Sequence, residues 1–385
     1  MTDVVIAGVG RTETGEHWEL SLRDLAALAI QEAIQDSRSL RPQALFVGNM
    51  LAPVLSSQAH LGALLADYTG MRGIEASTIE SGGASGGAAL RSGFMAVASG
   101  LVDVALLVGV EKITDKIGPS VENALSTNTD SDFEAPQGLT LTAQAALIMR
   151  RYMHEYGVAH EAFAGFALNA HANAAHNSLA MFRSPISVET YTKANPVIPP
   201  MNMFDIAPNA DGAAALVLTR PELLPKGYPH RLVRVAGSSM ANDRLALHDR
   251  LDLTDFPAAR LSIQRACAQA GITPGEADLF ELYDAYSIFA ALSLEAADLS
   301  PRGLGWKLAQ NGQVGLQGLM PIATFGGLKG RGNPGGATGV YQIVEAALQL
   351  RDQAGANQVP GAQRALVQCL GGAAATAVTH ILEKI

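Results

Sequence analysis

The chain has few cysteines, few aromatic residues and few charges for its length. Only Cys267 and Cys369 occur among its 385 residues, which leaves no disulfide framework and predicts a reducing, cytoplasmic location. Charged residues make up 16% of the chain and hydrophobic residues 48%, whereas disordered chains are rich in charge and poor in Ile, Leu and Val. Together with 39 glycines, this composition predicts a globular chain with a large core and a closely packed backbone.

Long hydrophobic runs and basic clusters are also missing. No apolar run reaches membrane-spanning length, and residues 1–8 enter a strand-like run without a charged leader, so neither a membrane span nor a signal peptide is expected. The formal net charge is −9 and Lys and Arg do not cluster, which argues against nucleic acid as a partner. His171 and His176 are five residues apart and fall on different faces of a helix, so we expect no metal site.

One pattern of apolar residues occurs twice along the chain. Residues 22–40 have apolar side chains at helical spacing and lead into a strand-like run at 44–47, and residues 256–272 do the same before 279–282. Alternating helices and strands are typical of α/β proteins with mostly parallel sheets. The sequence therefore predicts two similar α/β halves, and we expect a mixed central sheet in each.

Each half also contains a glycine-rich turn, a helix and then a buried strand. These pairs of helix and strand are residues 82–100 with 102–110, and residues 332–350 with 364–370. Similar alanine-rich runs at 211–219 and 371–379 are expected to close each half with a strand.

Two segments interrupt this repeat. Residues 221–230 carry three prolines and a glycine, which predicts a boundary between an N-terminal half, residues 1–225, and a C-terminal half, residues 226–385. The stretch 115–208 has helical pieces and a loop-rich tail and has no counterpart in the second half. We expect it to form an inserted cap region.

Four segments have the composition of active-site loops. Residues 326–339 read GGLKGRGNPGGATG, residues 80–90 read ESGGASGGAAL, residues 281–287 read ELYDAYS and residues 368–372 read QCLGG. The spacing Gly330-x-Gly332-x-x-Gly335 matches a dinucleotide fingerprint literally. It comes late in the chain, contains Pro334 and follows no clear strand, so a nucleotide fold is not expected.

In order and spacing these segments, with VGVEK at 108–112, HANA at 171–174 and DGAAA at 211–215, resemble the thiolase superfamily over essentially the whole chain. The resemblance implies the thiolase fold, in which two similar α/β halves form a five-layered αβαβα arrangement with an inserted loop domain. It also implies acyl-CoA chemistry, with coenzyme A as part of the substrate and no bound cofactor.

The resemblance locates the expected site and shows three replacements in it. Matching Ala84 to Ala89 puts Gly83 where thiolases have the nucleophilic cysteine, which removes the acylated group. Asn333 stands where the superfamily has a histidine before the proline. Tyr283 stands where archaeal and sterol-carrier-type thiolases have another histidine.

The remaining expected site residues come from the same segments. Tyr286 replaces a phenylalanine of the archaeal and sterol-carrier type, with Asp284 beside it, and Cys369 matches the cysteine that moves the proton of the α-carbon. Gly83, Gly332 and Gly371 are expected to contact the substrate. We predict that Gly83, Tyr283, Asn333 and Cys369 meet in one pocket.

Structural roles are the alternatives at several of these positions. Tyr286 and Tyr283 are also compatible with packing beside a strand end, and Cys369 with a buried small hydrophobe. Cys267 lies among alanines of a helix and is expected to be structural. Ser81 and Ser85 flank the missing cysteine, but their shift in position turns the side chains elsewhere, so neither is expected to replace it.

The replacements favour a retro-aldol cleavage, which needs no acyl-enzyme. A base takes the proton of a β-hydroxyl, the bond between the α- and β-carbons breaks, and the thioester enolate is held and protonated. Tyr283 or Tyr286 with Asp284 is suited to the hydroxyl, Asn333 and the N–H groups at the helix start to the oxyanion, and Cys369 to the α-carbon. The empty place at Gly83 is expected to leave room for a bulky acyl group.

The chain thus resembles the superfamily branch of steroid-CoA aldolases, which work with a zinc-ribbon and OB-fold partner of the DUF35 kind. We expect a β-hydroxyacyl-CoA of the steroid side-chain type as substrate and, from the low charge fraction and the resemblance, a homodimer. Two alternatives remain: a Claisen-type acyltransferase, and a subunit that binds acyl-CoA or a partner without chemistry.

Overall fold

The first half of the chain builds a five-stranded mixed sheet with helices on both faces. The computed structural model describes residues 3–385. The elements of this half are β1 (Val5–Arg11), α1 (Leu22–Asp36), β2 (Ala44–Gly48), α2 (Ala52–Leu55), α3 (Leu61–Tyr68), β3 (Glu75–Ile79), α4 (Ser85–Ala98), β4 (Val104–Glu111) and β7 (Gly212–Thr219). The helices expected over 22–40 and 82–100 are present, with shorter bounds.

The second half repeats this order of elements. They are β8 (Val233–Asn242), α9 (Pro257–Ala270), β9 (Leu279–Glu281), α10 (Ser287–Ala296), α11 (Gly305–Leu308), α12 (Thr338–Leu350), β10 (Arg364–Gly371) and β11 (Thr376–Lys384). The expected helix over 256–272 begins at Pro257, a residue suited to a first helical position, and ends before Gly271, which has a positive φ.

The strand pairings show the same topology in both halves. The strand order is β3-β2-β4-β7-β1-β8-β11-β10-β9, and in each half two pairings are antiparallel and one is parallel across equivalent strands. The parallel pairing of β2 with β3 has only a single bridge, Phe280 to Ile322, as its counterpart. The mixed central sheet predicted for each half is therefore confirmed, and the pairings are not mostly parallel, because β7 and β11 each run against both neighbours.

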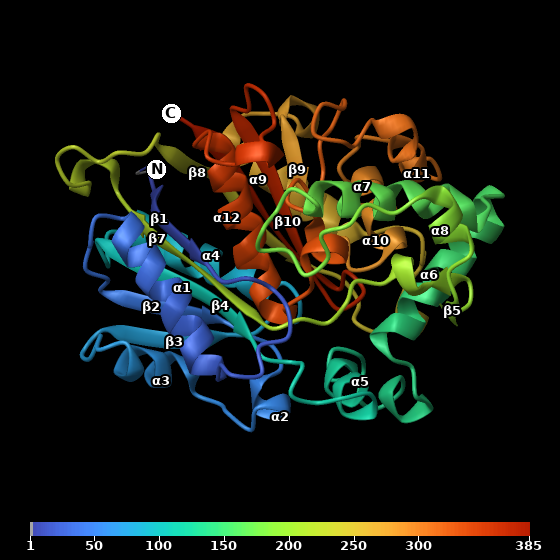
Figure 1. The fold of residues 1–385 in the computed structure, drawn as a ribbon, viewed down its shortest axis with the longest axis horizontal. Coiled ribbons are helices and arrows are strands. Elements are labelled where there is room, and N and C mark those ends of the chain that lie inside the picture. The colour runs from blue at the N-terminus through green and yellow to red at the C-terminus, as the bar shows by residue number, and fades with distance from the viewer. Residues whose placement is uncertain (1–2) are drawn as a thin grey trace.

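The five-layered αβαβα arrangement is confirmed. Helices α1 and α3 cover the outer face of the first sheet, α4 and α12 lie between the two sheet halves, and α9 and α10 cover the outer face of the second (Figure 1). The two halves of the sheet are joined where Val5 of β1 pairs with Arg234 of β8. The sheet thus bends around the two central helices, and both of its halves share their core.

Glycines allow the outer helices to approach the sheet at equivalent places. A Cβ at Gly8 of β1 would overlap the carbonyl oxygen of Ala33 in α1, and a Cβ at Gly237 of β8 would overlap that of Ala266 in α9. Because each glycine has no side chain, the helix backbone rests directly on the strand. The two halves thus repeat the same contact between a strand glycine and an outer helix.

The two glycine-rich segments meet at the starts of the central helices. A Cβ at Gly86 of α4 would lie 2.7 Å from the nitrogen of Val340, and a Cβ at Gly339 of α12 would lie 2.5 Å from the nitrogen of Gly87. The backbones of α4 and α12 therefore touch at their N-termini. Glycine is required at Gly86 and Gly339 by this helix contact, so these glycines need not be explained by nucleotide binding.

The strand expected over 371–379 was placed too early. Strand β10 continues through Gly371, a turn follows, and β11 begins at Thr376. Gly372 and Ala374 have φ values of 58° and 62°, which a strand does not allow. Residues 371–379 and 211–219 are thus similar in sequence, but the equivalent strands β11 and β7 do not begin at matching positions of the two runs.

Residues between β4 and β7 form a separate group of helices, green in Figure 1. They are α5 (Pro119–Ser126), α6 (Leu141–Tyr156), α7 (Ala164–Ala174), α8 (Val188–Thr192) and the short strands β5 (Pro196–Ile198) and β6 (Met201–Asn202). Helix α6 packs on α10 of the second half. The expected boundaries at 115–208 and near residue 225 stay predictions.

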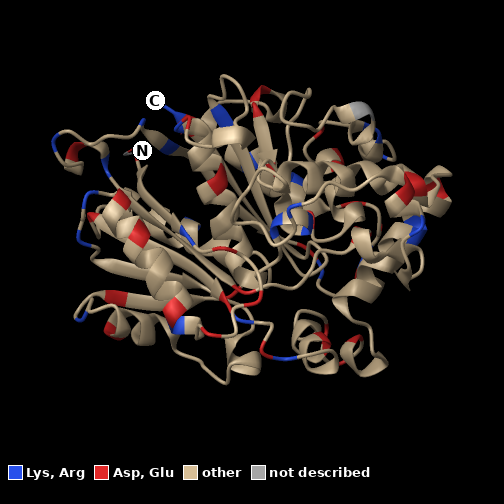
Figure 2. Cartoon of the chain, in the orientation of Figure 1, with Lys and Arg blue, Asp and Glu red and all other residues tan. Residues whose placement is uncertain are grey.

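Charged residues are dispersed over the molecule. In the view of Figure 2, Lys and Arg are scattered among Asp and Glu. No helix within residues 3–385 is both long and apolar enough to cross a membrane.

Asp211, at the end of the inserted residues, binds residues 112–114 at their start. Its carboxylate lies 2.7 Å from the Lys112 ammonium and accepts hydrogen bonds from the N–H groups of Ile113 and Thr114. Burial alone would raise the pKa of Asp211, but these partners hold it below its usual value. Lys112 has a second, exposed partner in Asp115.

We predict that Asp211→Asn lowers the free energy of unfolding by about 3 kcal/mol, because Lys112 loses its buried partner. Asp115→Asn is the matched control and should change it by no more than about 1 kcal/mol, since Asp115 is exposed. Chemical denaturation of both variants measures the difference. Equal effects of the two substitutions would contradict this role of Asp211.

Candidate functional site

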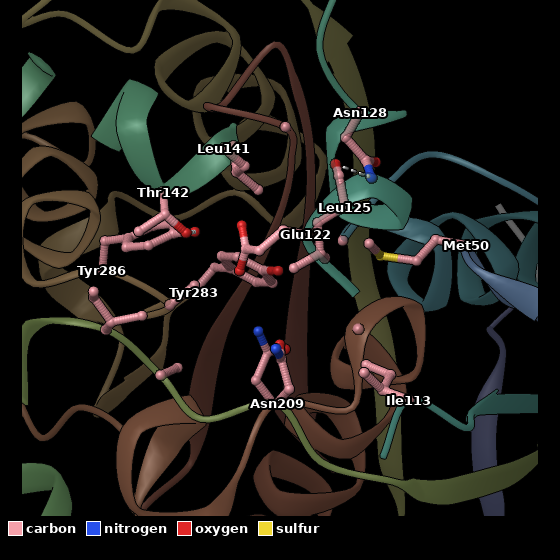
Figure 3. Close-up of a pocket in the computed structure, with 17 residues that line it drawn as sticks. Met50, Ile113, Glu122, Leu125, Asn128, Leu141, Thr142, Asn209, Tyr283 and Tyr286 are labelled. Carbon is pink, nitrogen blue, oxygen red and sulfur yellow. Dashed lines mark hydrogen bonds between the residues drawn. The ribbon is translucent and has the colours of Figure 1, made fainter. Parts of the chain in front are cut away.

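A narrow cavity of about 50 Å³ lies where loops from both halves meet the inserted residues. It is lined from four directions: the turn before α4, the loop between β9 and α10, the loop before α12, and helices α5 and α6 (Figure 3). Its lining includes Gly83 and the polar residues Glu122, Thr142, Asn209, Tyr283, Tyr286 and Asn333.

Residues 206–210 hold two of these loops together. Ile206 pairs with Tyr286, and the Ala207 N–H donates to the Ala285 carbonyl at 2.8 Å. Further along, Asn209 pairs with Asn333. The end of the inserted residues thus runs as a strand-like bridge between the tyrosine loop and the asparagine loop.

The Tyr283 phenol occupies the space in front of Gly83. A Cβ at position 83 would overlap the phenol oxygen and would lie 2.8 Å from Cζ of Tyr283 and 2.7 Å from the carbonyl oxygen of Leu370. The expectation that Gly83 leaves room for a bulky acyl group was therefore wrong. The space that a side chain there would need is filled by the phenol.

Burial determines the protonation of Tyr283. It raises the pKa of the phenol well above its ordinary value, and neighbouring Tyr286 and Cys369 raise it further, while the side chain of Asn333 acts in the opposite direction. The phenol is therefore protonated at neutral pH. It can donate a proton or a hydrogen bond into the cavity.

Asn333 is held through its backbone and through one side-chain atom. Its N–H donates to the Pro208 carbonyl at 3.0 Å, and its carbonyl accepts from the Ala210 N–H at 3.1 Å. The Oδ1 atom accepts from the Thr338 hydroxyl at 3.0 Å. Because Oδ1 is engaged, the amide NH₂ is the end that serves as donor toward Tyr283 and the cavity.

Tyr286 lies on the other side of the cavity from the central helices. Its hydroxyl is 3.0 Å from that of Thr142 in α6, and its ring packs edge-on against Phe289. Burial raises the pKa of Tyr286 as well. This tyrosine both packs against the protein core and presents a protonated hydroxyl to the cavity.

Asp284 does not line the cavity. Its Oδ1 accepts a hydrogen bond of 2.7 Å from the Leu328 N–H, and a Cβ at Gly327 would lie 2.6 Å from either carboxylate oxygen. It therefore holds the single π-helical turn Gly327–Arg331. Gly332, at the end of that turn with φ 113°, packs toward Ala210 and also lies outside the residues that line the cavity.

Cys369 is buried between the two central helices. A Cβ at Gly87 or at Gly339 would lie 2.8 Å from its sulfur. Burial raises the pKa of the thiol to about 12, although the Gly87 N–H acts in the opposite direction. Cys369 is not among the residues that line the cavity. Gly371 is not among them either, and it packs against the carbonyl of Ser81.

The N–H groups and serines at the start of α4 have partners inside the protein. The Ser85 N–H donates to the Gly82 carbonyl, and the Gly87 N–H is directed at Cys369. The Ser85 hydroxyl bonds within the turn to Gly82 at 2.6 Å, and the Ser81 hydroxyl bonds to Glu80 at 2.7 Å. Both hydroxyls donate to backbone carbonyl oxygens, which are not bases that could activate them, and two N–H groups of the helix start are already engaged.

Glu122, Thr142 and Asn209 are among the cavity residues that the sequence reasoning missed. Glu122 and Thr142 come from the inserted residues, where no motif marked individual positions. Asn209 lies two residues before Asp211 of the DGAAA motif, and this proximity was an available signal. Within the described residues no group of three or more His, Cys, Asp or Glu side chains is arranged to hold a metal ion.

Comparisons with known proteins agree with this architecture. A family model described as thiolase, N-terminal domain, matches residues 4–200, and one described as thiolase C-terminal domain-like matches residues 239–384. An acetyl-CoA acetyltransferase of Methanothermobacter thermautotrophicus is 38% identical over 100% of both chains. The chain belongs to the thiolase family.

Other relatives of this chain bear different names. The benzoylsuccinyl-CoA thiolase subunit BbsB of Thauera aromatica is 31% identical, over 96% of this chain and 94% of its own. Among solved structures, one named Ltp2-ChsH2(DUF35) aldolase superposes with a TM-score of 0.86 at 24% identity, over 99% of this chain and 98% of that one. At this identity the superposition shows the shared fold.

Membership of the thiolase family does not restore the missing nucleophile. Gly83, Tyr283 and Asn333, which the sequence singled out as replacements, lie together at the cavity, whereas Cys369 lies behind it. The site of this chain therefore has a protonated phenol directly beside the glycine.

We predict that Gly83→Ala destabilises the protein by about 1–3 kcal/mol, because the added methyl group overlaps Tyr283. In a Tyr283→Ala background the same substitution should cost less, with a coupling of about 1 kcal/mol. Gly275→Ala is the control, since a Cβ there meets no atom within 4 Å. Additive effects at 83 and 283 in denaturation experiments would show that the two residues do not share this space.

Proposed function

We propose that this member of the thiolase family cleaves the bond between the α- and β-carbons of a β-hydroxyacyl-CoA by a retro-aldol reaction, without an acyl-enzyme. The observation that carries the proposal is the overlap of the Tyr283 phenol with the side-chain position of Gly83. A proton donor thus occupies the place of a nucleophile. Such a site is suited to an enolate that must be held and protonated.

The donors at one end of the cavity fit the thioester. The Tyr283 hydroxyl and the Asn333 amide NH₂ face the same space and can both donate to the thioester oxygen, on which negative charge develops as the bond breaks. Tyr283 is also suited to protonate the α-carbon, a role that the buried Cys369 is not placed to fill. Coenzyme A belongs to the substrate, and the proposal requires no bound cofactor.

The size of the cavity limits what is proposed for the acyl group. About 50 Å³ is far below the 300–1,000 Å³ typical of small-molecule sites. The volume gives no support to a bulky acyl group of the steroid side-chain type. The proposal is therefore confined to β-hydroxyacyl-CoA as a class.

A Claisen-type acyltransferase is the second candidate, and the names of the relatives favour it. The 38% identical relative is named acetyl-CoA acetyltransferase. Against it stands the chemistry of position 83, since a glycine cannot be acylated. Cys369 has a thiol near the site, and burial keeps this thiol protonated.

We predict that the purified protein cleaves a short β-hydroxyacyl-CoA and forms no acyl adduct detectable by mass spectrometry. Tyr283→Phe should slow cleavage by roughly 10²- to 10⁴-fold, as is typical for loss of a positioned acid or base. Acetoacetyl-CoA with free CoA is the comparison substrate. Thiolysis of that substrate, or an acyl adduct on Cys369, would support the transferase instead, and binding without turnover would support a non-catalytic subunit.

The assay should be run with and without a protein of the DUF35 kind. The structure that shares this fold carries DUF35 in its name, and we propose the same kind of partner here. A partner that raises turnover would support this assignment.

We also propose a homodimer that forms through the edge strand β3. Residues 75–78 of this strand are exposed, and an open edge of this kind can pair with a second chain. Sedimentation equilibrium should show a dimer, and Ser77→Lys, which adds a charge to the edge, should weaken it. A stable monomer of the unmodified protein would contradict the proposal.

A further inference from the structure

Glu122 presents a carboxylate to the cavity from outside the motif segments. It lies on α5 and lines the cavity with Tyr283 and Tyr286. Figure 3 shows it near the centre of the site, and its charge adds to burial in raising the pKa of Tyr286. Burial is the cause of its raised pKa, with no hydrogen-bond or charge partner contributing among the described residues. The side chain is only half-buried, so it is both solvated and directed inward.

The apolar side of α5 holds Glu122 in this position. Val121 and Ala124 pack with Leu51, Leu55 and Ile113. The adjacent helix α2 has the sequence APVL and α5 itself has PSVENALS, so neither contributes another titratable group. The titratable groups that face Glu122 are the two phenols across the cavity.

A retro-aldol reaction needs a base at the β-hydroxyl, and the phenols are not suited to that task. Both are protonated at neutral pH, as an ordinary phenol is, and burial raises the pKa of each further. Asp284, beside them in the sequence, is turned away and bonded to the Leu328 N–H. Of the described residues that line the cavity, Glu122 is the one with a carboxyl group.

We propose that Glu122 is the catalytic base that removes the proton of the substrate β-hydroxyl. This inference rests on the proposed retro-aldol function and assigns its missing base. The carboxylate takes the hydroxyl proton and the C–O bond becomes a carbonyl. The electrons of the bond between the α- and β-carbons then form the enolate of the thioester.

The protons balance without a further reactant. Tyr283 gives its proton to the α-carbon, which completes the shortened acyl-CoA, and the resulting phenolate is reprotonated by the acid form of Glu122. Glu122 and Tyr283 then return to their starting states. The carbonyl product and the acyl-CoA leave as two molecules.

The test compares Glu122→Gln, Glu122→Asp and Glu122→Ala with the unmodified protein on a short β-hydroxyacyl-CoA. We expect Glu122→Gln to lower kcat by roughly 10²- to 10⁴-fold with KM changed by less than about threefold. Glu122→Asp should retain more activity than Glu122→Gln, and added formate should partly rescue Glu122→Ala. Asp132→Asn, which removes an exposed carboxylate from the same inserted region, should behave like the unmodified protein.

The pH profile gives a second readout. The acid limb of kcat should titrate above the ordinary value of a glutamate, because burial raises the pKa of Glu122, and this limb should be absent in Glu122→Gln. Thermal unfolding of each variant shows whether it is folded.

The outcomes separate the two proposals. If the unmodified protein cleaves the substrate and Glu122→Gln does so at a rate within about threefold, the role of Glu122 is overturned while the function stands. A rise in KM with unchanged kcat would assign Glu122 to binding and would also overturn it. If the unmodified protein does not cleave, with or without a DUF35 partner, both proposals fail.

Discussion

The contact between the starts of α4 and α12 is the constraint on which the site depends. At Gly86 and Gly339 the two helix backbones touch without intervening side chains. Each helix belongs to a different half, so this contact packs the two halves directly against each other at the starts of α4 and α12. The turn that carries Gly83 and the loop that carries Asn333 each lead into one of these helices, and they are brought together for that reason.

Position 83 and position 283 are best understood as one change. A side chain at 83 and the Tyr283 phenol cannot occupy the same space, so the loss of one group accompanies the presence of the other. The exchange replaces a place for a nucleophile with a buried phenol. Because burial favours the neutral form, the phenol supplies protons and hydrogen bonds and does not act as a base.

Local patterns in the sequence were sufficient to predict two similar α/β halves, whereas the five layers and four of the residues that line the cavity, Gly83, Tyr283, Tyr286 and Asn333, were predicted from the resemblance to thiolases. Periodic apolar residues and glycine spacing are local patterns, and both halves display them. The sequence could not show that Asp284 turns toward Leu328 or that Cys369 lies behind Gly87, because neighbours in a strand end point to different sides.

Other failures came from contacts between distant segments. Glu122 reaches the cavity because α5 packs on α2 and Ile113, and no local pattern encodes that approach. The space in front of Gly83 was expected to be open because one residue was considered without its partner. The turn after Gly371 was missed since alanine suits strand and turn alike, and only the φ values separate them.

Most buried carboxylates around the site have hydrogen-bond donors from other loops. Glu111 accepts from the N–H groups of Met50 and Gly336 at 3.0 Å. Burial raises its pKa, these donors act in the opposite direction, and the net pKa is about 7. Glu281 likewise accepts from the Thr324 N–H at 3.0 Å.

Such carboxylates hold the loops that form the cavity, and a substrate has no access to their engaged oxygens. Glu122 differs from them in both respects, since its carboxylate faces the cavity and no donor among the described residues contributes to its pKa. A group that stabilises no loop has its lone pairs available for a proton. In this protein the hydrogen-bond partners of a carboxylate therefore distinguish one that holds a loop from one that can accept a substrate proton. Residue type alone does not reveal this difference.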